Sequence, residues 1–327
     1  MYRRIVVPLD GSPFARTALR FATGIACRAR ADIELVHVHI PAHLEPDLFD
    51  LTPFHFTGVV PADAGFDRQR LRQEAEQLEE EALALCRAAS LHVTSRAVTG
   101  TIDEAIEREA RTFGADLIVM ATHYAAGSER ALLSSVGHAV LRRATVPVLL
   151  VHPWETPAAP ESPVDFRRIL VPLDGSVFSE QMLGSAADLA RLFDARIHLL
   201  YIDVPLRTRI PDETLRHVQA SHTSHNPGLG YLQEIARSLG PAIRDPLIET
   251  VVSGTAGPAI LDAALRGGAD AIAMATHGRT GLRRRIMGST TVEVLAQTRL
   301  PVLLCRPERA DKPESVLESA ATAHTII

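Results

Sequence analysis

The stretch RRIVVPLDGS, residues 3–12, returns almost unchanged as RRILVPLDGS at residues 167–176. A second pair follows further along the chain. MATHYAAGSERALLSSVGHAV, residues 120–140, and MATHGRTGLRRRIMGSTTVEV, residues 274–294, have the same length and begin with the same four letters. Repeats of this size indicate that one domain occurs twice in the chain.

The repeat divides the 327 residues into two domains, as the length of the chain also favours. We expect a first domain at residues 1–152, a linker at 153–166, a second domain at 167–307 and a polar tail at 308–327. The linker is rich in proline and has no apolar period. The second copy is shorter, because the first carries a longer excursion between residues 41 and 95.

Short β-branched runs alternate with helical stretches in each copy, which indicates βαβ units and a parallel sheet. These runs are almost wholly apolar, as expected of strands that helices cover on both faces. We therefore predict an α/β fold with two tandem doubly wound domains. The predicted strands are residues 5–9, 33–38, 94–99, 117–121 and 147–151, and then 168–173, 197–202, 248–253, 271–275 and 301–305. The predicted helices of the second copy are residues 178–193, 229–239, 258–266 and 290–297.

The composition is that of a globular protein, with 46% hydrophobic residues, 22% charged residues and a net charge of -5. This charge gives no reason to expect a nucleic acid as partner. No apolar run approaches the ~20 residues that span a bilayer, so we expect no membrane partner either. Cys27, Cys86 and Cys305 form no CxxC pair, which favours a reducing, cytoplasmic setting.

Three segments of the second copy follow predicted strands and should meet at one edge of the sheet. They are LDGS at residues 173–176, SGTAG at 253–257 and MATHG at 274–278. In open parallel sheets, ligands bind at this edge, where the strand order reverses. The edge is therefore the first place to look for a binding site.

The last of these segments leads towards a helix start with the features of an anion site. Gly278 would let a ligand approach the backbone closely, since glycine has no Cβ. Gly288 and Ser289 precede a predicted helix, whose first N–H groups and positive dipole end attract anions. Thr290 and Glu293 have the spacing of a capping box. The pattern predicts a phosphate site.

Plainer interpretations of the same residues stay open. The glycines are also common turn residues, and Asp174 can simply bond the backbone of its own turn. The run Arg283, Arg284 and Arg285 can add charge around phosphates or form a solvated face.

Several known motifs are absent from the sequence. It has no GxxxxGK[ST] of a P-loop and no GxGxxG after the first strand. It also has no HEXXH, no GxSxG and no four-ligand zinc spacing, so hydrolase chemistry has no support from the sequence.

VPLDGS after a first strand, ATHG after a fourth, and GS nine residues later resemble the universal stress protein (UspA-like) family, here in tandem over nearly the whole chain. ATP-binding members of that family carry Gly-x2-Gly-x9-Gly-Ser/Thr. The second copy has Ala275 at the first glycine and matches the rest. The resemblance implies an adenine-nucleotide alpha-hydrolase-like fold with five parallel strands per domain in the order 3-2-1-4-5.

The family's members dimerise through the last strand. In a tandem chain this implies that PVLLV, residues 147–151, lies beside PVLLC, residues 301–305, as an intramolecular pseudo-dimer. A further homodimer is an additional expectation.

The resemblance also implies a ligand, which is ATP or another adenine nucleotide, with Mg²⁺ expected beside ATP. The residues implied for the adenosine part are Asp174 and Ile202, with Met274 and Ala275 beside it. The residues implied for the phosphates are Gly278, Gly288, Ser289 and Thr290, with Thr291 as a further candidate.

The first copy departs from this pattern. It has Tyr124 and Ser134 at the places of Gly278 and Gly288, although Asp10 remains. A ring and a Cβ thus stand where a ligand would approach the backbone. We predict that the first domain binds ATP weakly or not at all.

The expected function is a nucleotide-responsive stress or signalling module without catalytic residues. A tandem partner-binding protein without nucleotide and a slow ATPase are the alternatives. Adenylyl transferases and sulfur-inserting ATP pyrophosphatases carry a HIGH signature or an SGGxDS loop, and neither occurs here. His123 and His277 are expected to order their loops by hydrogen bonding. His217, His222 and His225 are expected to be solvated and to bind no metal.

Overall fold

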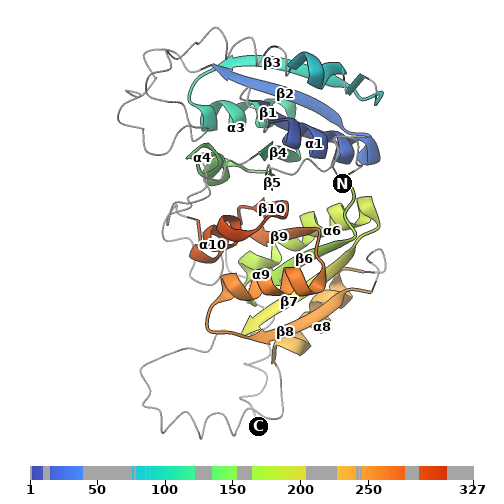
Figure 1. Ribbon diagram of the computed structural model, residues 1–327, viewed down its shortest axis with the longest axis vertical. Helices are drawn as coiled ribbons and strands as arrows, with labels where there is room; N and C mark the ends of the chain where they lie inside the picture. Colours follow the sequence, from blue (N-terminus) through green and yellow to red (C-terminus); the bar gives the residue numbers. More distant parts are fainter. Residues whose placement is uncertain are drawn as a thin grey trace, which may run out of the picture.

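The computed structural model describes residues 2–9, 15–39, 76, 79–84, 86–87, 89–121, 135–152, 164–203, 227–240, 243, 245–276 and 287–307. They form an α/β fold around one sheet that runs the length of the molecule (Figure 1). The strands are β1 (Arg4–Leu9), β2 (Asp32–His39), β3 (Val93–Thr99), β4 (Leu117–Ala121), β5 (Val148–Val151), β6 (Arg168–Leu173), β7 (Arg196–Asp203), β8 (Leu247–Val252), β9 (Ala271–Ala275) and β10 (Val302–Cys305). The helices are α1 (Ala15–Ala29), α3 (Ile102–Phe113), α4 (Ser135–Arg143), α5 (Val177–Glu180), α6 (Met182–Phe193), α8 (Pro227–Ser238), α9 (Ala256–Gly267) and α10 (Ser289–Gln297).

The strand order is β3-β2-β1-β4-β5-β10-β9-β6-β7-β8. Within each domain the strands are parallel and follow the order 3-2-1-4-5, as predicted. The two half-sheets join where β5 and β10 pair antiparallel, with Leu149 opposite Leu303. These two leucines occupy equivalent places in the repeat, so a pseudo-two-fold axis passes between them. The predicted pairing of PVLLV with PVLLC is confirmed.

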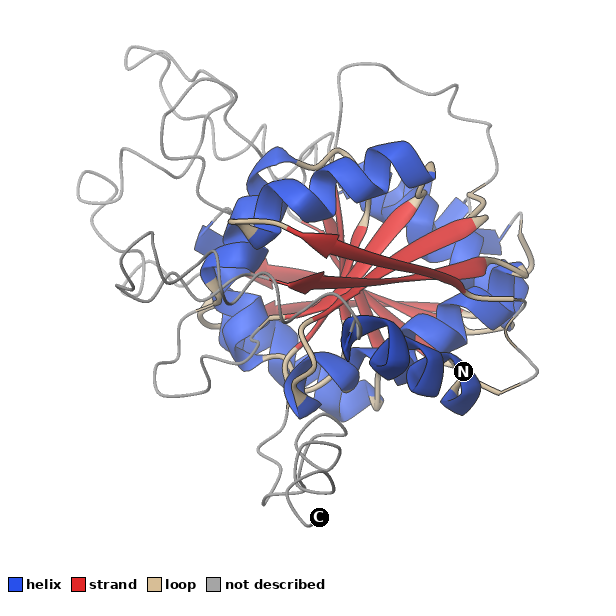
Figure 2. Cartoon of the chain, turned by 90° about the horizontal axis from the view of Figure 1, so that it is seen from below, coloured by secondary structure: helices blue, strands red, loops and turns tan. Residues whose placement is uncertain are grey.

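Helices cover both faces of the sheet, which explains why the strands are apolar on both sides (Figure 2). One face carries α1, α6 and α8, and the other carries α3, α4, α9 and α10. Successive strand residues alternate between the two layers, so Ile5 and Val7 belong to one core and Val6 to the other. Each core contains residues of both domains, and the hydrophobic interior is therefore continuous across the join.

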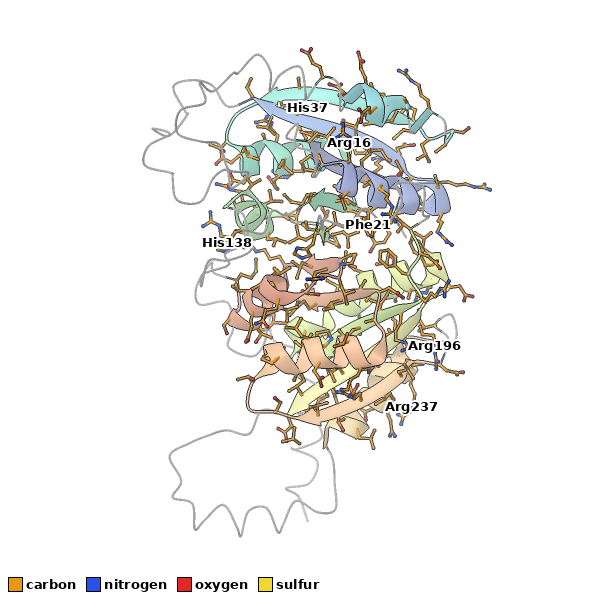
Figure 3. The ribbon with its side chains drawn as sticks, viewed as in Figure 1. Arg16, Phe21, His37, His138, Arg196 and Arg237 are labelled. Atoms are coloured by element: carbon orange, nitrogen blue, oxygen red, sulfur yellow. The ribbon has the colours of Figure 1, made fainter. Side chains whose placement is uncertain are left out.

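Two aromatic residues cross the join on the face of α1 and α6. Phe166, 1% exposed, packs against Phe193 at a ring-centroid distance of 4.8 Å and against Phe21 of the first domain at 6.0 Å. Phe21 lies on α1 (Figure 3). Tyr2 stands at the equivalent place in the first repeat, and its hydroxyl donates to the Ser185 carbonyl of α6 at 3.0 Å. Residues 164–166, which end the predicted linker, are thus part of the packed join.

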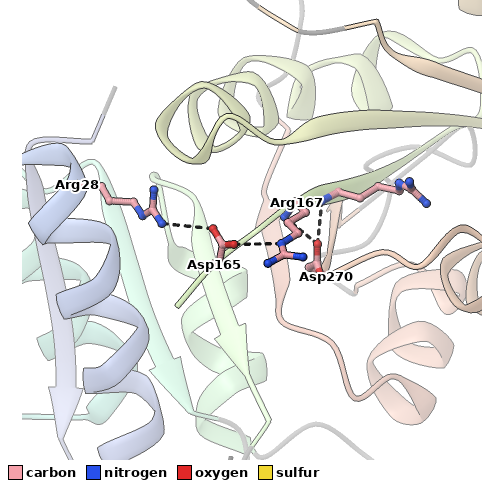
Figure 4. Close-up of polar contacts among 5 residues, drawn as sticks. Arg28, Asp165, Arg167 and Asp270 are labelled. Carbon is pink, nitrogen blue, oxygen red and sulfur yellow. Dashed lines mark hydrogen bonds and ion pairs between the residues drawn. The ribbon is translucent and has the colours of Figure 1, made fainter. Parts of the chain in front are cut away.

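The residues that start the two repeats are held in the same way. The Asp270 carboxylate accepts the backbone N–H groups of Arg167 and Arg168 at 2.7 and 2.8 Å (Figure 4). Asp116 does the same for Arg3 and Arg4 in the first domain, at 2.6 and 3.2 Å. Figure 4 also shows Asp165 between Arg28 of α1 and Arg167. Each first strand is thus tied to the turn that precedes its neighbouring strand.

The predicted helix at residues 178–193 is in fact two helices, α5 and α6, which meet at Gln181. The first begins at its N-cap Ser176, whose Oγ accepts the Ser179 N–H at 3.2 Å. This side-chain cap starts a helical turn directly after the LDGS segment. The break shortens the main helix, α6, which begins at Met182.

Candidate functional site at the carboxyl edge of the second domain

The strand order brings the predicted adenosine residues to one edge. In the sheet, β6 lies between β9 and β7. Asp174 directly follows β6, Ile202 stands near the end of β7, and Met274 and Ala275 end β9. After β6 the chain continues into β7 on one side of it, and β9 lies on its other side. The strand order thus reverses at β6, and open α/β sheets bind ligands at the carboxyl edge beside such a reversal.

Pro172 separates two of these strands near their ends. β6 pairs with β7 along Arg168–Leu173, whereas its pairing with β9 comprises Ile169 and Leu170. A proline has no N–H to extend a ladder. The strands β6 and β9 therefore part before the edge, beside Asp174.

The Asp174 side chain is oriented by its own turn. Its Oδ1 accepts the Ser176 N–H at 3.0 Å and the Ser176 Oγ–H at 2.5 Å. Gly175 has φ +79°, a conformation that glycine adopts without strain. The local-turn interpretation of Asp174 is thus correct, and the same bonds hold a half-buried carboxylate at the edge.

The apolar members of the predicted site lie on the two sides of the sheet. Ile202 and Met274, 9% and 5% exposed, belong to the core under α9 and α10, together with Met287. Ala275, 7% exposed, belongs to the opposite core. An adenosine group placed at this edge would therefore contact Ile202 and Met274 from the side on which α10 begins.

The start of α10 presents backbone donors at the same edge. Its N-cap is Gly288, with φ -60° and ψ 143°, and no side chain of the described residues caps it. The first helical bond is that from the Val292 N–H to the Gly288 carbonyl, at 3.1 Å. The N–H groups of Ser289 and Thr290 precede that bond and have no acceptor within the helix. Ser289 is exposed and Thr290 half-buried, so both are accessible.

The predicted capping box of Thr290 and Glu293 is wrong. The helix begins at Ser289, which places Thr290 inside the first turn and not at the N-cap. The Glu293 carboxylate lies against Gly257 in the first turn of α9, where a Cβ would clash with it. A carboxylate is favourable there, because the positive end of the α9 dipole is close. Glu293 thus leaves the α10 start open.

Hydrogen bonds join this helix start to the end of β9. The Gly288 N–H donates to the Thr276 carbonyl at 2.9 Å, and the Thr276 N–H donates to the Cys305 carbonyl at 2.9 Å. Thr291 Oγ1 donates towards the carbonyls of Ala275 and Thr276, at 3.3 and 3.4 Å. The hydroxyl of Thr291 therefore points into the protein, towards the end of β9.

A second polar group lies behind Asp174, on the α8 side. The Tyr231 hydroxyl donates to Glu180 Oε1 at 3.0 Å. Burial raises the pKa of Glu180, and the neighbouring Asp174 adds to this rise. The pKa of Tyr231 is also raised, first by burial and then by the negative charge of Glu180. No pattern in the sequence predicted this pair, because its partners come from separate elements.

Several predicted residues lie outside the described part of the chain. They are Gly278, Arg283, Arg284, Arg285 and His277 of the second domain, Asp10, Tyr124, Ser134 and His123 of the first, and His217, His222 and His225. Across the described ranges, no group of three or more His, Cys, Asp or Glu is placed to hold a metal ion. In the same ranges, none of the helices is long and apolar enough to cross a membrane. Cys27, Cys86 and Cys305 are free thiols.

Comparison with known proteins matches both halves of the chain to one family. The model of the universal stress protein family matches residues 1–152 and 165–306. A universal stress protein of Methanocaldococcus jannaschii is 29% identical over 149 residues, which is 45% of this chain and 85% of that protein. One of Bacillus subtilis is 26% identical over 154 residues, 46% of this chain and 99% of that protein. The crystal structure of a universal stress protein from Archaeoglobus fulgidus shares the fold, with a TM-score of 0.61 and 19% identity over 93% of this chain and 96% of that one.

Proposed function

The chain belongs to the universal stress protein family, and from this premise we propose that its second domain binds an adenine nucleotide, ATP in the first instance. Occupancy of the site would change the surface that the protein offers to a partner, so that the chain acts as a nucleotide-responsive stress module. We propose binding without efficient turnover, with at most a slow ATPase activity.

One observation carries this proposal. The start of α10, which no side chain in the described part of the chain caps, lies at the same edge as Asp174, Ile202 and Met274. A phosphate fits such a helix start, because backbone N–H groups and the dipole both favour negative charge. The Asp174 carboxylate is an acceptor, which suits the hydroxyl groups of a ribose. A divalent cation such as Mg²⁺, when bound with ATP, would neutralise part of the phosphate charge.

We propose that the first domain serves as a scaffold. It supplies half of the strands in the described sheet and part of both cores. Its sequence has Tyr124 and Ser134 where the second domain has glycines. The three free thiols favour action in a reducing cytoplasm. Association of two chains into a homodimer is a further part of the proposal.

Nucleotide stoichiometry tests the proposal. Mass spectrometry of the freshly purified chain should find an adenine nucleotide, and titration calorimetry with ATP should find one site per chain. Asp174→Ala should weaken ATP binding about 10- to 100-fold, the cost of a hydrogen bond to a charged group. Asp10→Ala, the same change in the first domain, is the matched control and should leave the affinity unchanged.

The outcomes separate the parts of the proposal. A chain that binds no adenine nucleotide would contradict nucleotide binding altogether. Two equal sites would contradict the inactive role of the first domain. Loss of ATP binding in Asp10→Ala but not in Asp174→Ala would show that the nucleotide binds to the first domain and not to the second.

A further inference from the structure

Thr291 lies in the first turn of α10 and is buried, with 2% of its surface exposed. Its hydroxyl has one hydrogen, which is shared between the carbonyls of Ala275 and Thr276 at 3.3 and 3.4 Å. These distances are longer than usual for hydroxyl donors, so each contact is individually weak. The hydroxyl nevertheless connects the helix directly to the end of β9.

A second bond reinforces this connection. The Thr276 carbonyl also accepts the Gly288 N–H at 2.9 Å, and the Thr276 N–H is bonded to the Cys305 carbonyl of β10. We call the bonds of Gly288 and Thr291 to the end of β9 the α10 clasp. Since β9 is a central strand, the clasp fixes the position of the first turn of α10 relative to the sheet.

The clasp decides where the α10 donors stand relative to Asp174. The N–H groups of Ser289 and Thr290 lie between Gly288 and Thr291, the two residues that make the clasp. Displacement of the turn by a fraction of an ångström would weaken every hydrogen bond to a phosphate at once, because such bonds depend steeply on distance and angle. The adenosine residues Ile202 and Met274 lie on strands and make none of the bonds of the clasp. Ala275 contributes its backbone carbonyl, and its own position is fixed by the pairing of β9 with β10.

The first domain lacks the hydroxyl that this clasp needs. In the aligned MATH segments, Gly137 of α4 stands at the place of Thr291. A glycine supplies no hydroxyl, and inside a helix it costs about 1 kcal/mol relative to alanine. The first copy therefore differs from the second at a buried position, in addition to Tyr124 and Ser134.

We propose that Thr291 is a positioning residue for the phosphate part of the nucleotide site, acting through the α10 clasp. It orients the N–H groups of Ser289 and Thr290 and does not itself contact the adenosine part. This inference rests on the proposed nucleotide binding of the second domain. On this inference, the affinity for the phosphates depends on the buried hydroxyl of Thr291, whereas the affinity for adenosine does not.

The test compares two ligands and three variants by titration calorimetry on the full chain. Thr291→Val keeps the shape of the side chain and removes the hydroxyl, so ATP should bind about 5- to 10-fold more weakly, the equivalent of one hydrogen bond. Adenosine, which has no phosphate, should bind with an affinity changed less than about twofold. Thr291→Ser keeps the hydroxyl and should restore ATP binding to near the wild-type value.

Thr298→Val is the matched control at the other end of α10. Thr298 is also buried, and its Oγ1 accepts the Leu300 N–H at 3.1 Å. The control should lower the thermal midpoint and leave ATP affinity unchanged. Equal loss of ATP and adenosine affinity in Thr291→Val, or a loss of ATP affinity as large in Thr298→Val, would overturn the positioning role.

The two proposals fail in different ways. Wild-type protein that does not bind ATP would contradict the proposed function. Wild-type binding that is sensitive to Asp174→Ala but unaffected by Thr291→Val would leave the proposed function standing and refute the role of Thr291.

Discussion

His152 follows the last strand of the first domain, and 7% of its surface is exposed. Burial lowers the pKa of its imidazole from 6.5 to about 4, because the charged ring would lose its hydration. Burial likewise lowers the pKa of His138 and of His198. Between the two pKa values of His152, the unfolded chain binds a proton that the folded chain does not. The stability from neutral His152 is therefore complete above about pH 6.5 and is lost as the pH falls towards about 4.

His152→Leu should flatten the dependence of stability on pH. The wild type should lose about 2 kcal/mol more than the variant between pH 7 and pH 5. Urea unfolding at both pH values measures this loss of stability. The carboxylates titrate in both proteins alike, so their contribution cancels when the variant is compared with the wild type. His92→Leu, at an exposed histidine, provides the control. Parallel curves for His152→Leu and the wild type would show that burial of this ring does not control the acid response.

Helix α8 approaches β7 closely through one glycine. A Cβ on Gly228 would clash with the Tyr201 ring, lying 2.9 Å from Cε1 and 3.0 Å from Cγ. The ring is buried and packs against Tyr231 at 5.9 Å, so it cannot easily move aside. Gly230, two residues further along the same helix, has no heavy atom within 4 Å of its Cβ position. Close packing therefore requires a glycine at Gly228, whereas the space around Gly230 would accept a side chain.

The two alanine substitutions should have opposite effects on the free energy of unfolding. Gly228→Ala should lower it by about 1–3 kcal/mol, because overpacking displaces the ring. Gly230→Ala should raise it by up to about 1 kcal/mol, because alanine is the better helix former. Urea unfolding of both variants measures the effects. A stabilising Gly228→Ala would mean that α8 does not rest on Tyr201.

At the scale of the whole molecule, the described residues form one sheet and two cores, and each core extends through both domains. The join includes the β5–β10 pairing on the sheet, Phe166 between α1 and α6, and the bond from Tyr2 to Ser185 of α6. Such a join couples the domains, because neither can unfold without exposing apolar surface of the other. We expect one cooperative unfolding transition for the full chain.

Phe166→Ala should lower the unfolding free energy by about 3–5 kcal/mol and separate the transition into two. Differential scanning calorimetry resolves both effects. Phe113→Ala, on α3 and outside the join, is the control and should destabilise without separating the transition. A single transition in Phe166→Ala would mean that the coupling of the two domains does not depend on Phe166.

The sequence by itself determined the features that depend on local pattern and repetition. The bounds of β6 and β9 were predicted correctly, since apolar runs specify them. The strand order and the pairing of β5 with β10 were expected from the resemblance to the universal stress protein family and were also confirmed. The meeting of Asp174 and Met274 at one edge also followed, because parallel strands bring their carboxyl ends together. Ile202 was implied by the family resemblance.

Only the tertiary structure decided which donors and acceptors meet. It moved the start of α10 to Ser289, turned Glu293 towards Gly257 and bonded the Thr291 hydroxyl to the end of β9. Thr291 and its partners belong to separate elements, and no periodicity encodes such a contact. Their pairing exists because the packing of α10 against the sheet brings them within hydrogen-bonding distance.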